Sequence, residues 1–215
     1  MTYNLKHLAL AAGLALAGGS AQAASDFSFT GFFNGDADTV AFAFNVGASS
    51  TVTLRSYSYA GGTMADGTVI AAGGFDPMLS LWTGSGILLA EYDDGPLAVP
   101  SDPDTGAGFD TNFSASLAAG NYIAVIAQYY NPALSTILSN GFTQVSSTFT
   151  AAYGCSNGQF CDVAASNRTS FWAFDILGVE SAVVDPGLSP VPLPASAPLL
   201  LAGVAALGLY RRRHR

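Results

Sequence analysis

Apolar residues recur at every second position in short runs between residues 24 and 182, and this alternation constrains the fold more than any other feature of the sequence. In the run 39–46, valine or phenylalanine occupies every even position, so an extended strand would carry one apolar face. β-Branched and aromatic residues dominate these runs, and none continues into a 3.6-residue period. Further strands are predicted at 27–33, 50–59, 78–82, 87–91, 111–117, 121–130 and 170–177, with shorter ones at 68–71 and 146–150.

Turn-forming residues separate these runs. Residues 83–86, Thr-Gly-Ser-Gly, lie between two runs and are a hairpin signal. Many short strands joined by such turns are typical of antiparallel sandwiches and jelly rolls, and the region is long enough to bury one core. We therefore predict an all-β domain, an antiparallel β-sandwich or jelly roll, at residues 24–182, followed by a Pro/Gly spacer at 183–190.

The N-terminus has the pattern of a secretory signal peptide. Lys6 precedes an apolar run at 8–17, and Ala21 and Ala23 form a small-x-small cleavage site. We predict export through the Sec machinery with cleavage after Ala23. The alternative, an N-terminal membrane anchor, would need a longer apolar run without a cleavage site.

The C-terminus combines an uncharged apolar run with a basic end. The run at 195–210 has 16 residues, roughly 24 Å as a helix, which is slightly short for a hydrocarbon core of about 30 Å. The basic cluster would remain in the cytoplasm, so the upstream domain would face outward. From the residues alone, this is a single transmembrane helix that anchors the tail. The basic cluster consists of Arg211, Arg212, Arg213 and Arg215.

This tail resembles the PEP-CTERM class of bacterial sorting signals in its VPLPA variant, at residues 191–215. Leu193 stands where the parent motif has glutamate. The resemblance implies processing by an exosortase-type membrane protease. It also implies an inner-membrane-anchored precursor that reaches the cell envelope, the outer surface or the medium of a Gram-negative bacterium. The motif comprises Val191, Pro192, Leu193, Pro194 and Ala195.

The region between the two ends is strongly acidic. Arg55 and Arg168 are its two basic residues against fifteen acidic ones, which gives a formal charge of −13. Such a surface repels nucleic acid and anionic lipid, and it favours cations and neutral polymers as partners. The region contains neither lysine nor histidine, so a Ser-His-Asp or Cys-His arrangement cannot be built there.

Two cysteines, Cys155 and Cys161, lie close together in a Gly- and Asn-rich segment. In an exported chain, an even pair predicts a disulfide. A metal–thiolate site would require further cysteine or histidine ligands, which this region does not contain.

Four motifs occur in the order seen in bacterial pre-peptidase C-terminal-like domains, and the chain is most similar to exported PEP-CTERM proteins marked by an FDP motif, here residues 75–77. The resemblance covers residues 26–176 and implies a small β-sandwich jelly roll in an extracellular setting. It implies no activity, because a fold alone does not define one. The four motifs lie at 35–42, 74–82, 87–95 and 117–125.

Acidic loops are the best candidates for cation binding. Asp102, Asp104 and Asp110 surround two glycines, and alternating carboxylates on a tight loop suit the six to eight oxygens that Ca²⁺ requires. Asp93 and Asp94 precede this loop and would contribute, whereas Asp36 and Asp38 form a second candidate pair. The alternative is that all of these are solvated turn carboxylates.

Tyr129 and Tyr130 end a predicted strand before an Asn-Pro turn, so at least one ring should be exposed. Exposed rings could stack on the sugars of an exopolysaccharide, although aromatic residues on strands are more often part of a core.

The sequence therefore predicts a non-enzymatic structural or adhesive component of the cell surface or extracellular matrix. One alternative is a calcium- or exopolysaccharide-binding module. The other is a hydrolase that uses two carboxyl groups, one of them with a raised pKa.

Overall fold

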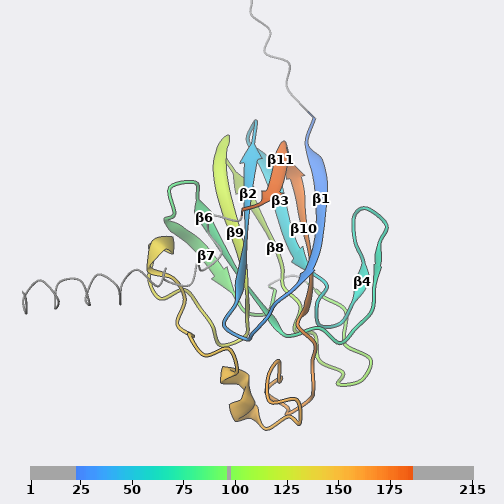
Figure 1. Ribbon diagram of the computed structural model, residues 1–215. Coiled ribbons are helices and arrows are strands. Elements are labelled where there is room, and N and C mark those ends of the chain that lie inside the picture. Colours follow the sequence, from blue (N-terminus) through green and yellow to red (C-terminus); the bar gives the residue numbers. More distant parts are fainter. Residues whose placement is uncertain (1–22, 96–97, 186–215) are drawn as a thin grey trace, which may run out of the picture.

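Two antiparallel sheets pack face to face in the computed structural model, which describes residues 23–95 and 98–185 (Figure 1). The predicted all-β sandwich is confirmed. One sheet has four strands in the order β1-β10-β3-β8, which are β1 (Ser25–Phe32), β3 (Ser50–Ser56), β8 (Asn112–Leu117) and β10 (Phe171–Val179).

The second sheet has five strands in the order β11-β2-β9-β6-β7. A separate two-stranded ribbon pairs β4 (Gly62–Thr63) with β5 (Val69–Ile70). The strands of the second sheet are β2 (Thr39–Val46), β6 (Pro77–Thr83), β7 (Leu88–Tyr92), β9 (Gly120–Gln128) and β11 (Ser181–Val184).

The alternating side chains that predicted the strands also build the core. Phe42 from β2 lies 5.1 Å from Phe174 of β10, measured between ring centroids, so the two sheets are joined by aromatic contact. Leu54 and Ile126 are fully buried in the same cluster. The apolar residues at alternate positions of the strands therefore face the core between the two sheets, as the sequence pattern predicts.

Three details of the predicted secondary structure were wrong. Residues 146–150, predicted as a strand, contain the start of the short 3₁₀ helix η2 (Phe149–Tyr153), and a second, η1 (Leu138–Asn140), precedes it. The strand predicted at 50–59 ends at Ser56. The strand β11 follows the one predicted to be last, and it pairs with β2 through Val184, past the predicted domain boundary at 182. A continuous apolar alternation does not reveal where a strand leaves its sheet.

The long connections begin and end at one end of the sandwich. The segments that follow β1, β3, β7 and β9 leave their strands there, at the lower end in Figure 1, whereas the opposite end has short turns. Part of the segment after β9 runs back beside β7, where the backbone N–H of Leu138 donates to the carbonyl of Gly86 in the β6–β7 turn. The segment after β9 carries the predicted disulfide, which joins Cys155 to Cys161 and is thereby confirmed. This loop-bearing end is where a binding site would be assembled on the rigid sheets.

A buried network around Arg168 holds three of these connections together. Arg168 Nη1 lies 3.1 Å from Asp102 Oδ2, and its Nε lies 3.4 Å from Asp162 Oδ2. The guanidinium also stacks on the ring of Tyr59 at 3.7 Å, and the Tyr59 hydroxyl donates a 2.8 Å hydrogen bond to Asp162. Arg168 therefore connects the loop that contains Asp102, the segment that carries the disulfide and the chain that follows β3.

Neither predicted end of the chain is described. The signal peptide, except for Ala23, and the sorting tail at 191–215 lie outside the described residues. Among the residues that the structure does describe, no helix is long and apolar enough to cross a membrane.

Replacement of Arg168 by alanine should destabilise the domain by roughly 3–5 kcal/mol, because it leaves two buried carboxylates without their counter-charge. Arg55→Ala is the matched control, since Arg55 contacts the ring of Tyr57 at 4.7 Å, which is worth about 1 kcal/mol or less. Chemical denaturation of both variants measures the difference. Equal losses for the two arginines would contradict the assigned role of Arg168.

Candidate functional site

Asp76, Asp93 and Asp94 converge at the loop-bearing end of the five-stranded sheet. Asp76 immediately precedes β6, and the other two immediately follow β7. Because β6 and β7 are antiparallel neighbours, the start of one strand lies beside the end of the other. Each carboxylate places an oxygen within 4.8 Å of the others. The three side chains form a compact acidic cluster, called the Asp76 triad below.

Asp76 is buried, and one oxygen of its carboxylate has no hydrogen-bond partner among the described residues. Its exposed fraction is 3%, and no group of the described residues donates to its Oδ1 or to Oδ1 of Asp93. Gln128, opposite Pro77 in the β6–β9 ladder, is also fully buried, and neither its amide oxygen nor its amide nitrogen has a partner in that part of the chain. An unsatisfied buried polar group costs roughly 1–3 kcal/mol and more when charged. Such a cluster requires an explanation other than folding.

The other buried carboxylates contrast with Asp76. Asp36 accepts from the backbone N–H groups of Thr150 at 2.9 Å and Phe160 at 2.7 Å. Similar bonds from backbone or side-chain donors satisfy the remaining four, which are Asp102, Asp110, Asp162 and Asp175. Of the six buried aspartates in the described residues, Asp76 is the exception. The five others therefore have structural roles.

Burial and mutual repulsion disfavour ionisation of the triad. Burial is the main cause that raises the pKa of Asp76 well above its usual value, and the charges of Asp93 and Asp94 raise it further. Burial and the charge of Asp94 raise the pKa of Asp93 to about 6. Burial also raises the pKa of Asp94. A bound cation would offset this electrostatic cost, because it favours the charged form of each carboxylate.

The loop predicted to bind calcium does not form a shared site. In the described residues, the carboxylates of Asp102, Asp104 and Asp110 are not grouped within reach of one ion. Asp102 is paired with Arg168, and Asp104 is exposed. Although burial favours the neutral acid, hydrogen bonds from Arg168 and Thr105 lower the pKa of Asp102. Asp110 accepts from Ser56 Oγ and from the backbone of Tyr59 and Ala60.

The second predicted pair, Asp36 and Asp38, also serves the fold. Asp36 is engaged by the segment around η2, as described above. Asp38 accepts from the backbone N–H groups of Asn34 at 2.7 Å and Gly35 at 3.1 Å, and it thus closes the turn before β2. Of the acidic residues singled out from the sequence, Asp93 and Asp94 alone belong to the described cluster.

Tyr129, one of the two predicted tyrosines, lies beside the triad, and its ring is near those of Tyr130 and of a third tyrosine, Tyr153. The backbone N–H of Tyr129 donates to the carbonyl of Asp76 at 2.8 Å. The ring centroid of Tyr129 lies 5.9 Å from that of Tyr130 and 6.4 Å from that of Tyr153, at the end of η2. Burial, followed by the charges of Asp93 and Asp76, raises the pKa of Tyr129. The aromatic cluster and the acidic cluster are therefore neighbours.

Tyr130 adopts a backbone conformation that favours glycine. Its φ is 68°, and it occupies the third position of a turn closed by a 3.1 Å hydrogen bond from Asn131 N to Gln128 O. A turn with a positive φ at this position usually takes glycine there. The left-handed conformation costs a residue with a side chain roughly 1–2 kcal/mol. The Gln144 side chain donates to the Tyr130 carbonyl at 2.9 Å and helps to hold it.

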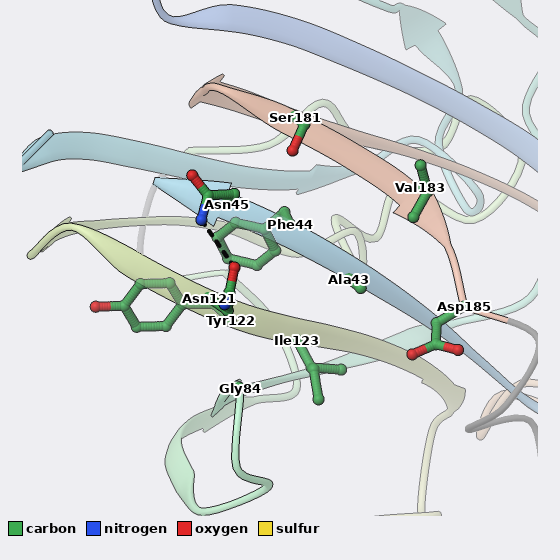
Figure 2. A pocket seen from close by; sticks show the side chains of 10 residues that line it. All are labelled: Ala43, Phe44, Asn45, Gly84, Asn121, Tyr122, Ile123, Ser181, Val183 and Asp185. Atoms are coloured by element: carbon green, nitrogen blue, oxygen red, sulfur yellow. Dashed lines mark hydrogen bonds between the residues drawn. The ribbon is translucent and has the colours of Figure 1, made fainter. Parts of the chain in front are cut away.

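A separate shallow pocket lies on the outer face of the five-stranded sheet, across β11, β2 and β9 (Figure 2). Two of its polar residues, Asn45 and Asn121, are hydrogen-bonded to each other at 2.8 Å. The ring of Tyr122 stacks on that of Phe44, with 5.6 Å between the ring centroids. The Tyr122 hydroxyl donates to the Ala118 carbonyl. Because these three side chains are already paired, the pocket offers fewer unpartnered groups than the triad.

Comparisons with known proteins add no further constraint on the site. No protein-family model matches the chain, and no curated protein matches it.

Sequence reasoning missed Asp76 and Tyr153 as site residues. Asp76 was noted within the FDP motif, but its neighbours Phe75 and Pro77 gave no sign that its carboxylate faces Asp93. An ionisable residue at the start of a strongly apolar strand was the available signal. Tyr153 gave no signal, because the segment that positions it has no regular period.

In a chelator, the stability of the domain should fall as the pH rises from about 4 to 7. The triad carboxyls have raised pKa values in the folded state, so their contribution is fully present below the unfolded value of 3.8 and is lost as the pH passes the folded values, near 6 for Asp93. Burial also raises the pKa values of Glu91 and Asp110, so these two carboxyls change the stability in the same direction. Melting temperatures measured in EDTA across this range test the sign.

Asp102 and Asp162 act in the opposite direction but at lower pH, because their pKa values are lowered below 3.8. In Asp93→Asn, the melting temperature in EDTA should fall less between pH 5 and pH 7 than it does in the wild type. A melting temperature in EDTA that rises from pH 4 to pH 7 would contradict the assigned state of the triad.

Proposed function

We propose that the chain is a non-enzymatic, exported β-sandwich module of the bacterial cell surface or extracellular matrix, stabilised by a calcium ion at the Asp76 triad. Its precursor is sorted by the VPLPA-type C-terminal signal and is processed by an exosortase-type protease. The resemblance of residues 26–176 to FDP-marked pre-peptidase C-terminal-like domains supports the same setting. The disulfide between Cys155 and Cys161 agrees with an oxidising compartment.

The observation that carries the calcium proposal is the grouping of three carboxylates, two of which have an unpartnered buried oxygen among the described residues. Two oxygens that bind the same Ca²⁺ lie at most twice the metal–oxygen distance apart, roughly 5 Å. The triad oxygens lie within 4.8 Å of one another. Hard carboxylate oxygens without histidine or thiolate neighbours suit Ca²⁺ or Mg²⁺, and the larger ion tolerates irregular geometry better.

A carboxylate-dependent hydrolase is the second candidate, and the raised pKa of Asp93, about 6, favours it. A raised pKa is what a general acid requires. However, three mutually close carboxylates with raised pKa values are also what a metal site looks like without its ion. Turnover of a polysaccharide that persists in a chelator would favour the hydrolase over the calcium module.

Millimolar Ca²⁺ should raise the melting temperature relative to the protein in EDTA. A ligand at 100 times its Kd adds about 2.7 kcal/mol, which corresponds to roughly 5–10 °C for a domain of this size. In Asp93→Asn the shift should disappear, while the melting temperature in EDTA should rise or stay the same, because one repelling charge is removed.

Asp104→Asn is the matched control, since it removes an exposed carboxylate from the neighbouring loop. It should retain the full calcium shift. Equal calcium-induced shifts of the melting temperature in the wild type and in Asp93→Asn would exclude the triad as the calcium site. Loss of the shift in Asp104→Asn would instead place the ion at the loop that contains Asp102, Asp104 and Asp110.

Replacement of both prolines of the sorting motif, Pro192→Ala with Pro194→Ala, should block processing. The precursor should then accumulate in the membrane fraction at its unprocessed mass, as measured by immunoblot and mass spectrometry of cell fractions. Pro186→Ala, in the preceding spacer, serves as the control and should be processed normally. Normal processing of the double variant would contradict the proposed sorting route.

A further inference from the structure

The Asp76 triad and the tyrosine cluster lie next to each other on the loop-bearing surface of the sandwich. The backbone N–H of Tyr129 donates to the Asp76 carbonyl, and the ring centroids of Tyr130 and Tyr153 lie 5.9 and 6.4 Å from that of Tyr129. Asp76 is buried with an unpartnered Oδ1, whereas Tyr130 has an exposed fraction of 60%.

We propose that this surface binds a neutral saccharide in a calcium-dependent manner. Two neighbouring hydroxyl groups of a pyranose coordinate the ion held by Asp76, Asp93 and Asp94, while the apolar face of a sugar ring stacks on Tyr130. The inference rests on the calcium site of the proposed function and assigns it a ligand class.

The coordination chemistry leaves room for such a ligand. Ca²⁺ takes six to eight oxygens, and three carboxylates supply at most six when every one of them is bidentate. Sugar hydroxyls are neutral oxygen ligands that can occupy the remaining positions. Asp94 is the exposed member of the triad, so the ion would be reached from the solvent side.

The backbone conformation of Tyr130 supports a role for its ring in ligand binding. Its φ of 68° favours glycine, yet the chain has a large aromatic residue at this position. Burial in the core does not account for that choice, since the ring is mostly exposed and contacts the ring of Tyr129. Strained residues with exposed functional groups cluster at ligand sites. A flat ring beside a cation is suited to a sugar, which has both an apolar face and hydroxyl groups.

The charge of the domain selects a neutral ligand over an acidic one. Residues 24–190 carry a formal charge of −13 and contain Arg55 and Arg168 as their basic residues. Arg168 is committed to Asp102 and Asp162, and Arg55 stacks on Tyr57. No arginine among the described residues is therefore placed to receive a sugar carboxylate, and the surrounding acids repel one.

The test uses the purified full-length protein, calorimetric titration and glycan arrays that carry neutral glucan, mannan and galactan oligosaccharides, with alginate as the acidic probe. At 1 mM Ca²⁺ at least one neutral oligosaccharide should bind, and EDTA should reduce its affinity at least tenfold. Tyr130→Gly should also reduce the affinity at least tenfold. Because glycine suits the turn, this variant should keep or raise the melting temperature and retain the calcium shift.

Two matched variants complete the design. Tyr130→Phe keeps the ring and should retain most of the affinity. Phe32→Ala removes another exposed ring, with an exposed fraction of 72%, from the other sheet and should bind normally.

The outcomes separate the two proposals. Calcium stabilisation without binding of any neutral probe overturns the saccharide inference and leaves the calcium site in place, as does calcium-dependent binding of alginate alone. Absence of the calcium shift overturns the proposed function itself, and saccharide binding unaffected by EDTA overturns the composite site. Unchanged binding in Tyr130→Gly removes the stacking role.

Discussion

Buried carboxylates hold the loops of this domain in place. Asp36 fastens the segment around η2 to the start of β2, and Asp110 fastens the chain after β3. Asp102 and Asp162 meet on Arg168, the one buried arginine of the described residues. Apart from the pair of Asp162 with Arg168, these bonds connect segments that are distant in sequence, so the irregular end of the sandwich is held by charged contacts as well as by apolar packing.

This dependence gives Asp76 its significance. A domain that satisfies five of its six buried aspartates among the described residues has the means to satisfy all of them. Asp76 instead faces two further carboxylates, and the resulting repulsion raises its pKa. Natural folds retain such local conflicts where function needs them. The strained turn at Tyr130, which is adjacent in space, is a second conflict of the same kind.

Residue periodicity predicted the β-sandwich, because each face of a strand is read directly from alternate positions, as in β2. The acidic loops pointed to only part of the candidate site. Asp93 and Asp94 were singled out as candidate calcium ligands, but they were grouped with Asp102. Spacing along a loop does not show which carboxylates accept backbone N–H groups or pair with Arg168. The role of Asp76 depends on the pairing of β6 with β7. Such a contact between separate strand ends has no local signature.

A crystal of the protein grown in millimolar CaCl₂ would show whether the Asp76 triad binds the ion. One ion is expected there, with oxygens from all three carboxylates at about 2.3–2.6 Å and the remaining positions open to solvent or ligand. The contradictory result would be a well-ordered triad without an ion, in which Asp76 is protonated and donates a hydrogen bond to Asp93. In that case the raised pKa values would belong to an acid pair, and the carboxylate-dependent hydrolase would become the better account.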